Sequence, residues 1–159
     1  MQAGENVLIE RTAARLFVED LKKAKVIEEN GKQIVVLEDG ERISKVKLVG
    51  TVVQKSVRPD KSYGYLILDN GTGTIRLRLW EEQMPLAEDV REGDLILVIG
   101  KIRVFKEEKY VVPEILKVLK DPRWERVHTL EVLKRKAFKR FVRSICAGGE
   151  QTNEHTPGI

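Results

Sequence analysis

Two short segments of the chain carry the side chains best suited to chemistry with a ligand. In TIRLRLW (residues 74–80) every second residue is aliphatic, so the intervening residues share the opposite side of a strand. In YGYLILD (63–69) two tyrosines alternate with inward-facing residues in the same way. The expected outward residues of the two segments are Tyr63, Tyr65, Arg76, Arg78 and Trp80. Aromatic faces stack on unpaired bases, and arginines bind phosphates. The two segments together therefore predict a surface for single-stranded nucleic acid.

Basic and aromatic residues also gather near the two loops that would border this surface. They are Lys55, Arg58 and Lys61 near the first loop, and Lys101, Arg103, Phe105, Lys106 and Lys109 near the last one. Acidic residues concentrate instead in 81–94, which carries six acidic residues and one basic residue. Without that segment, residues 45–119 carry 12 basic and 5 acidic residues, a net charge of +7, whereas the whole chain has +4. This distribution predicts a positive face opposite an acidic connector.

The residues that most enzyme chemistry needs are scarce. One cysteine, Cys146, and two histidines, His128 and His155, exclude an internal disulfide and a cysteine- or histidine-rich metal site. No glycine-rich loop ends in Lys-Ser or Lys-Thr, and the carboxylates are scattered over turns and the connector. We therefore expect no enzyme activity, no catalytic residue, no metal and no cofactor. No apolar run of about 18 residues exists, so no membrane partner is expected, and we expect a cytoplasmic, nucleoid-associated protein.

Five segments with strand character lie between residues 45 and 119. They cover 45–57, 63–69, 74–80, 94–105 and 110–119, with an acidic helix or loop connector between the third and the fourth. Gly50 and Gly100 interrupt the two long strands, as is typical of a bend or bulge, and Pro113 fits an edge or bulge position. A β-sandwich would need about seven strands. The pattern therefore predicts a mainly β fold, a five-stranded barrel of the OB type over residues 45–119.

The segments on either side of the barrel differ from it in character. Residues 1–44 are expected to form an extension that packs on the barrel, and 147–159 a disordered polar tail. Residues 120–146, with a net charge of +6, predict an amphipathic oligomerisation helix that ends at Gly148–Gly149. The apolar stripe of this helix is expected to form a subunit interface through Val127, Leu130, Leu133, Ala137, Phe138, Phe141, Val142 and Ile145. Burial of the stripe against the chain's own barrel is the alternative. His128 and the basic face with Arg135, Lys136 and Lys139 are expected in solvent, where the basic face could add to nucleic-acid affinity.

Three stretches of the barrel segment resemble a known family. They read KLVGTVVQKS, YGYLILDNGTGTIRLRLW and REGDLILVIGKI, and RLFVEDL before them is similar to the family's lead-in. They resemble the OB domain of archaeal replication protein A, and its middle subunit in particular.

The resemblance implies a non-enzymatic subunit that binds single-stranded DNA with little sequence preference in replication, repair and recombination. It also implies that the C-terminal helix joins helices of sister subunits in a hetero-oligomer, a heterotrimer in this family. Two other interpretations remain open from the residues. In the first, the barrel is an assembly subunit without DNA contact, its outward arginines are merely solvated, and Trp80 covers the barrel end. In the second, the chain is an RNA-binding OB module.

Overall fold

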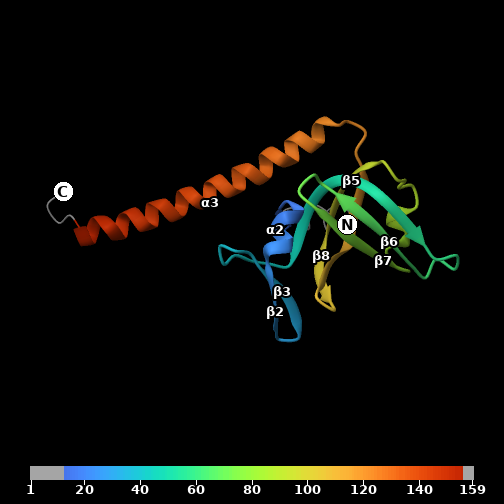
Figure 1. Cartoon of the computed structure of the whole chain (residues 1–159), viewed down its shortest axis with the longest axis horizontal. Coiled ribbons are helices and arrows are strands. Elements are labelled where there is room, and N and C mark those ends of the chain that lie inside the picture. The colour runs from blue at the N-terminus through green and yellow to red at the C-terminus, as the bar shows by residue number, and fades with distance from the viewer. Residues whose placement is uncertain (1–12, 156–159) are drawn as a thin grey trace, which may run out of the picture.

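The computed structural model describes residues 13–155 of the chain, with side chains described up to residue 145. Five strands form a barrel: β5 (Lys45–Val57), β6 (Tyr63–Asp69), β7 (Thr74–Trp80), β8 (Leu95–Phe105) and β9 (Glu108–Val118). They follow the order β5–β6–β7–β9–β8, and pairing of β5 with β8 closes the barrel (Figure 1). A short 3-10 helix, Met84–Ala87, lies in the connector between β7 and β8. The predicted mainly β, five-stranded OB barrel with one C-terminal helix is confirmed.

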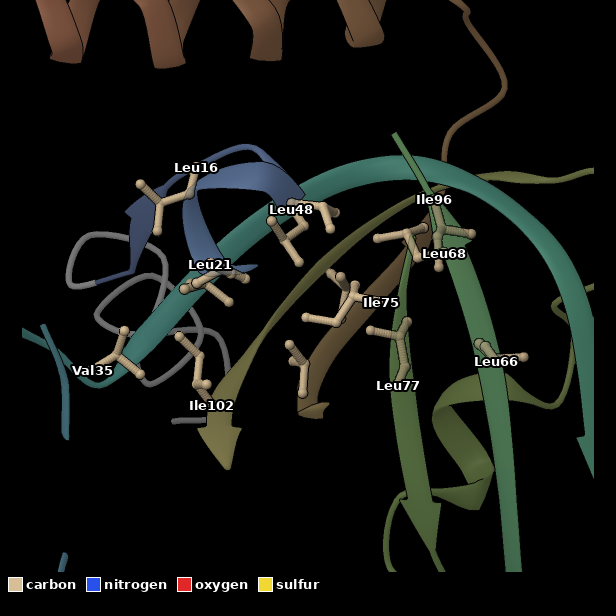
Figure 2. Packing of buried hydrophobic residues seen from close by; sticks show 14 of the residues in the cluster. Leu16, Leu21, Val35, Leu48, Leu66, Leu68, Ile75, Leu77, Ile96 and Ile102 are labelled. Atoms are coloured by element: carbon tan, nitrogen blue, oxygen red, sulfur yellow. The ribbon is translucent and has the colours of Figure 1, made fainter. Parts of the chain in front are cut away.

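The alternation of the strands sorts their side chains into core and surface. On β6 and β7, Leu66, Leu68, Ile75 and Leu77 are at most 2% exposed. Figure 2 shows them projecting from neighbouring strands into one packed interior. The outward residues of the same strands are therefore held on a rigid, close-packed support.

Close backbone approach explains the glycines of the two long strands. At Gly100, which lies opposite the bulge that β9 makes at Glu114, an added Cβ would lie 2.8 Å from Val111 Cγ1 and closer still to a backbone oxygen. In β5 the register shift lies between Val52 and Gln54. Gly50 is therefore not the bulge. Instead, it admits the Asp69 carbonyl oxygen, which would lie 2.7 Å from an added Cβ.

The described N-terminal residues complete the core of the barrel. β1 (Ala14–Arg15) pairs in parallel with β5, and α2 (Val18–Lys23) follows it. Leu16, Val18 and Leu21 are at most 1% exposed and belong to the same cluster as the barrel leucines. Figure 2 shows Leu16 and Leu21 in this cluster. β2 (Lys25–Glu29), β3 (Lys32–Val36) and β4 (Arg42–Ile43) form a separate antiparallel sheet. Residues 13–24 are therefore built into the domain and are not a loose arm.

The C-terminal helix, α3 (Arg123–His155), passes over the N-terminal segment and extends beyond the barrel (Figure 1). Two of its side chains are buried against the domain, His128 at 4% exposure and Val132 at 0%. The His128 Nε2–H donates a 3.1 Å hydrogen bond to the Leu16 carbonyl oxygen. The expectation that His128 lies on the helix surface is therefore wrong, because the helix docks through this residue.

The basic face of α3 turns toward the acidic N-terminal segment. Arg135 pairs with Glu41 at 2.5 Å, Lys136 with Asp20 at 2.8 Å and Lys139 with Asp39 at 2.6 Å. The expectation of a solvated basic face is wrong for these residues, because the acids of residues 20–41 compensate their charges. The opposite side of α3 is left exposed.

The structure places the end of α3 beyond the predicted boundary. The helix continues through Gly148–Gly149 to His155. A glycine inside a helix costs about 1 kcal/mol relative to alanine, which weakens the helix without forbidding it. Of the tail predicted to be disordered, residues 147–155 are helical, and 156–159 lie outside the described residues. Among the helices that the structure describes, none is long and apolar enough to cross a membrane.

Candidate nucleic-acid interface

Strand register brings predicted binding residues of β6, β7 and β8 to one side of the barrel, together with two residues of β9. On β6 and β7, Tyr63 is paired with Trp80 and Tyr65 with Arg78. The closure of the barrel adds β9 beside β7, with Tyr110 opposite Arg76. β8 follows, with Arg103 opposite Tyr110 and Phe105 opposite Glu108. We call this surface the aromatic–arginine face; its residues are Tyr63, Tyr65, Arg76, Arg78, Trp80, Arg103, Phe105, Glu108 and Tyr110.

Three rings form a row across this face. Tyr63 and Trp80 meet edge to face, with centroids 5.6 Å apart and planes at 62°. Trp80 and Tyr110 follow at 6.0 Å and 54°. Aromatic pairs of this geometry stabilise each other by about 0.5–1.5 kcal/mol beyond their buried area. Trp80 is still 40% exposed. The row is therefore fixed in position and open to solvent at its centre, as a stacking platform requires.

Arginines lie over two tyrosine rings of the face, one of which belongs to the ring row. The guanidinium carbons of Arg76 and Arg78 lie 4.4 Å from the ring centroids of Tyr65 and Tyr110, respectively. Such cation–π contacts hold the flat guanidinium groups in defined orientations. Gln54 steadies Tyr65 in turn, since its Nε2 donates a 3.0 Å hydrogen bond to the tyrosine hydroxyl.

One acid, Glu108, lies among these arginines. Its Oε1 is 3.4 Å from Arg76 Nε and 3.9 Å from Arg78 Nη2. Both arginine Nε atoms are buried and have no hydrogen-bond acceptor within the described structure. A single carboxylate offsets only part of the charge of these two arginines and Arg103. The face keeps a net positive charge that suits a polyanion.

The loop between β5 and β6 forms one rim of the face. Arg58 lies 5.3 Å from the ring centroid of Tyr63. Lys61 is exposed in the same loop with a φ of +57°. Both basic residues therefore lie beside the tyrosine end of the ring row, as the sequence predicts.

The tight turn between β8 and β9 forms the opposite rim. Phe105 is 55% exposed, and Arg78 and Lys106 lie 6.0 and 5.5 Å from the centroid of its ring. Lys106 and Glu107 both have positive φ values, +50° and +67°, a conformation that costs non-glycine residues about 1 kcal/mol or more each. Lys101 precedes Arg103 on β8, where it is paired with Val112, and its side chain is exposed. The turn thus presents an aromatic ring and a cation together.

Sequence reasoning missed two members of the face, Glu108 and Tyr110. Alternation in YVVPEIL contained a usable signal, since Val111 is buried and Tyr110 must then point outward. The sequence pattern did not reveal which strand lies beside β9. Its parallel pairing with β7 places Tyr110 beside Arg76 and Arg78. Across the part of the chain that the structure describes, no three His, Cys, Asp or Glu side chains gather where they could hold a metal ion.

Comparison with known proteins gives the barrel a family likeness. Residues 46–119 match the family model of the OB-fold nucleic acid binding domain. An uncharacterized protein of Methanocaldococcus jannaschii is 30% identical over 100 residues, 63% of this chain and 40% of that protein. Replication factor A protein 2 of Schizosaccharomyces pombe is 26% identical over 95 residues, 60% of this chain and 33% of that protein. The chain therefore spans less than half the length of these curated relatives.

Solved structures share the fold over more of the chain. A chain of a replication protein A heterotrimer bound to single-stranded DNA matches with a TM-score of 0.66 and 18% identity, over 79% of this chain and 96% of that one. A chain of the Schizosaccharomyces pombe Stn1–Ten1 complex matches with a TM-score of 0.70 and 19% identity, over 81% and 94%. With its closed barrel, its aromatic–arginine face and these relatives, the chain is an OB-fold protein similar to the replication protein A family.

Proposed function

We propose that this chain is a subunit of a replication protein A-like complex and binds single-stranded DNA on its aromatic–arginine face. The observation that carries the proposal is the ring row of Tyr63, Trp80 and Tyr110 with Arg76 and Arg78 beside it. Bases unstacked from a single strand would lie on the rings, and phosphates would meet the arginines and the loop lysines. Because every base has a π-face, such binding has little sequence preference. The cellular setting would be DNA replication, repair and recombination in the cytoplasm, at the nucleoid.

The exposed side of α3 supports the proposal of partner subunits. Leu130, Phe138 and Phe141 are more than 60% exposed, and Leu133, Val142 and Ile145 are between 44% and 57% exposed. Single exposed apolar residues are common, but a continuous stripe of this kind marks an interaction site. The helix already docks on its own domain through the opposite side, so the stripe is available to helices of sister subunits. A heterotrimer of the kind named for the structural relative would satisfy it.

The two tryptophans of the chain provide the test. Trp80 is at the centre of the ring row, and Trp124, 52% exposed at the start of α3, is the matched control. In Trp124→Phe, titration with oligo(dT) should quench the remaining emission, which comes from Trp80. In Trp80→Phe, the emission of Trp124 should change little. Affinity should fall linearly with salt on logarithmic axes. Binding detected by anisotropy without quenching of Trp80 would place the DNA elsewhere and refute the proposed face.

An assembly subunit without DNA contact is the second candidate, and the position of Glu108 favours it. This acid already neutralises part of the arginine charge, within 3.4–3.9 Å of Arg76 and Arg78. In that case Trp80→Ala would leave the affinity of the reconstituted complex for single strands unchanged. Competition by folded RNA stronger than that by single-stranded DNA would favour an RNA-binding module. We propose a non-enzymatic role in every case, and turnover in a hydrolysis assay with Mg²⁺ would overturn it.

A further inference from the structure

The β8–β9 hairpin reaches beyond the strand that supports it. The last β5–β8 pair is Lys45 with Lys101, whereas β8 continues to Phe105. The peptide groups of Val104 therefore lie on an edge that β5 does not cover. This overhanging part carries Arg103 and Phe105 on its front, within the aromatic–arginine face. An unsupported edge of this kind would leave the rim of the face free to move.

A side chain of the N-terminal sheet occupies that edge. Gln33 of β3 donates from Nε2 to the Val104 carbonyl oxygen at 3.2 Å, and the Val104 N–H donates to Gln33 Oε1 at 3.1 Å. One carboxamide thus makes both hydrogen bonds that a neighbouring strand would make. Figure 1 shows the β2–β3 hairpin and the end of β8 on the same side of the barrel.

A second contact holds the other strand of the hairpin. Lys109 is paired with Val104 in the register, and its Nζ donates to the carbonyl oxygens of Lys22, at 3.0 Å, and of Ala24. These carbonyls lie at the end of α2, where the helix leaves them without internal partners. Desolvation by partial burial, and to a lesser extent the charge of Lys22, lower the pKa of Lys109. Both strands of the hairpin are therefore held by residues 22–33, β8 through its edge and β9 through the Lys109 side chain.

We propose that Gln33 and Lys109 are positioning residues, which hold the β8–β9 hairpin so that Arg103 and Phe105 are presented on the nucleic-acid face. This inference rests on the proposed function, since it concerns the same face. Neither residue would touch the ligand. Without them, the hairpin would have to be ordered when the ligand binds, and ordering of flexible groups at an interface weakens affinity.

The experiment compares Gln33→Ala and Lys109→Met with Lys32→Met, which removes an exposed charge next to Gln33 on β3. Oligo(dT) affinity of the full chain is measured over a salt series. The first two variants should each bind about three- to tenfold more weakly, and Lys32→Met and Lys109→Arg should bind as the wild type does. The salt slope is the decisive readout. A lysine that contacted a phosphate would lower it by about 0.7 on replacement, whereas a positioning lysine leaves it unchanged.

Hydrogen exchange of the free protein separates failure of this inference from failure of the proposed function. Gln33→Ala and Lys109→Met should speed exchange in residues 102–110 and leave β6 and β7 protected. If the wild type binds no single strands, the proposed function fails. Unchanged exchange in the variants would then also refute the proposal that Gln33 and Lys109 hold the β8–β9 hairpin. If the wild type binds, either wild-type affinity in both variants or a lowered salt slope in Lys109→Met overturns the positioning role.

Discussion

Replacing Val132 with alanine is expected to destabilise the isolated chain by about 2–3 kcal/mol. The side chain of Val132, on α3, is fully buried against the domain. The replacement removes two methyl-sized groups, each of which contributes about 0.8 kcal/mol by burial. The cavity left between helix and barrel adds to this loss. Leu133, the next residue, is turned about 100° around the helix axis from Val132 and is 46% exposed. Leu133→Ala should therefore change the stability of the isolated chain by no more than about 0.5 kcal/mol.

Urea unfolding at several protein concentrations measures both effects. Val132→Ala should lower the midpoint at every concentration. Leu133→Ala should leave it unchanged in the monomer and should instead weaken association with partner subunits. If Leu133→Ala lowers the midpoint as much as Val132→Ala does, at concentrations where the chain is monomeric, α3 docks with its apolar stripe inward. The assignment of its two faces would then be refuted.

Three further predictions concern the barrel, the helix and the face. Gly100→Ala should lower the free energy of unfolding by more than about 2 kcal/mol, measured by thermal melting, because the added Cβ would clash with backbone and with Val111. Gly73→Ala should be close to neutral, because its Cβ would lie 3.4 Å from the nearest atom, Val18 Cγ1. Burial lowers the pKa of His128 below 6.5, despite the Leu16 hydrogen bond that raises it. The contribution of His128 to the free energy of unfolding should therefore be complete above pH 6.5 and be lost as the pH falls below that value. Unfolding curves over a pH series should show this loss in the wild type, and an equal loss of stability in His128→Gln would contradict the prediction. Arg78→Gln should weaken oligo(dT) binding and lower the salt slope by about 0.7 if Arg78 meets one phosphate, and an unchanged slope would exclude that contact.

The strands were predictable because local rules decide them. The bounds of β6 and β7 agree with the predicted segments residue for residue, since alternation and the turn between them are encoded within 20 consecutive residues. The same alternation correctly assigned Tyr63, Tyr65 and Trp80 to one surface. Tyr110 escaped because its place in the site depends on β9 lying beside β7. That neighbour is set by closure of the barrel, which pairs strands distant in the sequence.

The C-terminal helix shows the same limit of prediction from local sequence. Periodicity predicted an amphipathic α3 and separated an apolar side from a basic one. It could not decide which side docks, because that depends on what the helix meets. The acids Asp20, Asp39 and Glu41 attract the basic side, and Val132 and His128 occupy the space beneath it.

The amino-acid sequence by itself therefore determined the five barrel strands, the helix, the inward and outward residues of β6 and β7, and the charge of the predicted binding face. These depend on period, turn residues and composition, which act over a few neighbouring positions. Tertiary structure alone decided the completion of the ring row by Tyr110, the support of the β8–β9 hairpin by Gln33 and Lys109, and the exposed side of α3. Each of these joins groups that are far apart in the chain, and such contacts exist only after the barrel has closed and its core has packed.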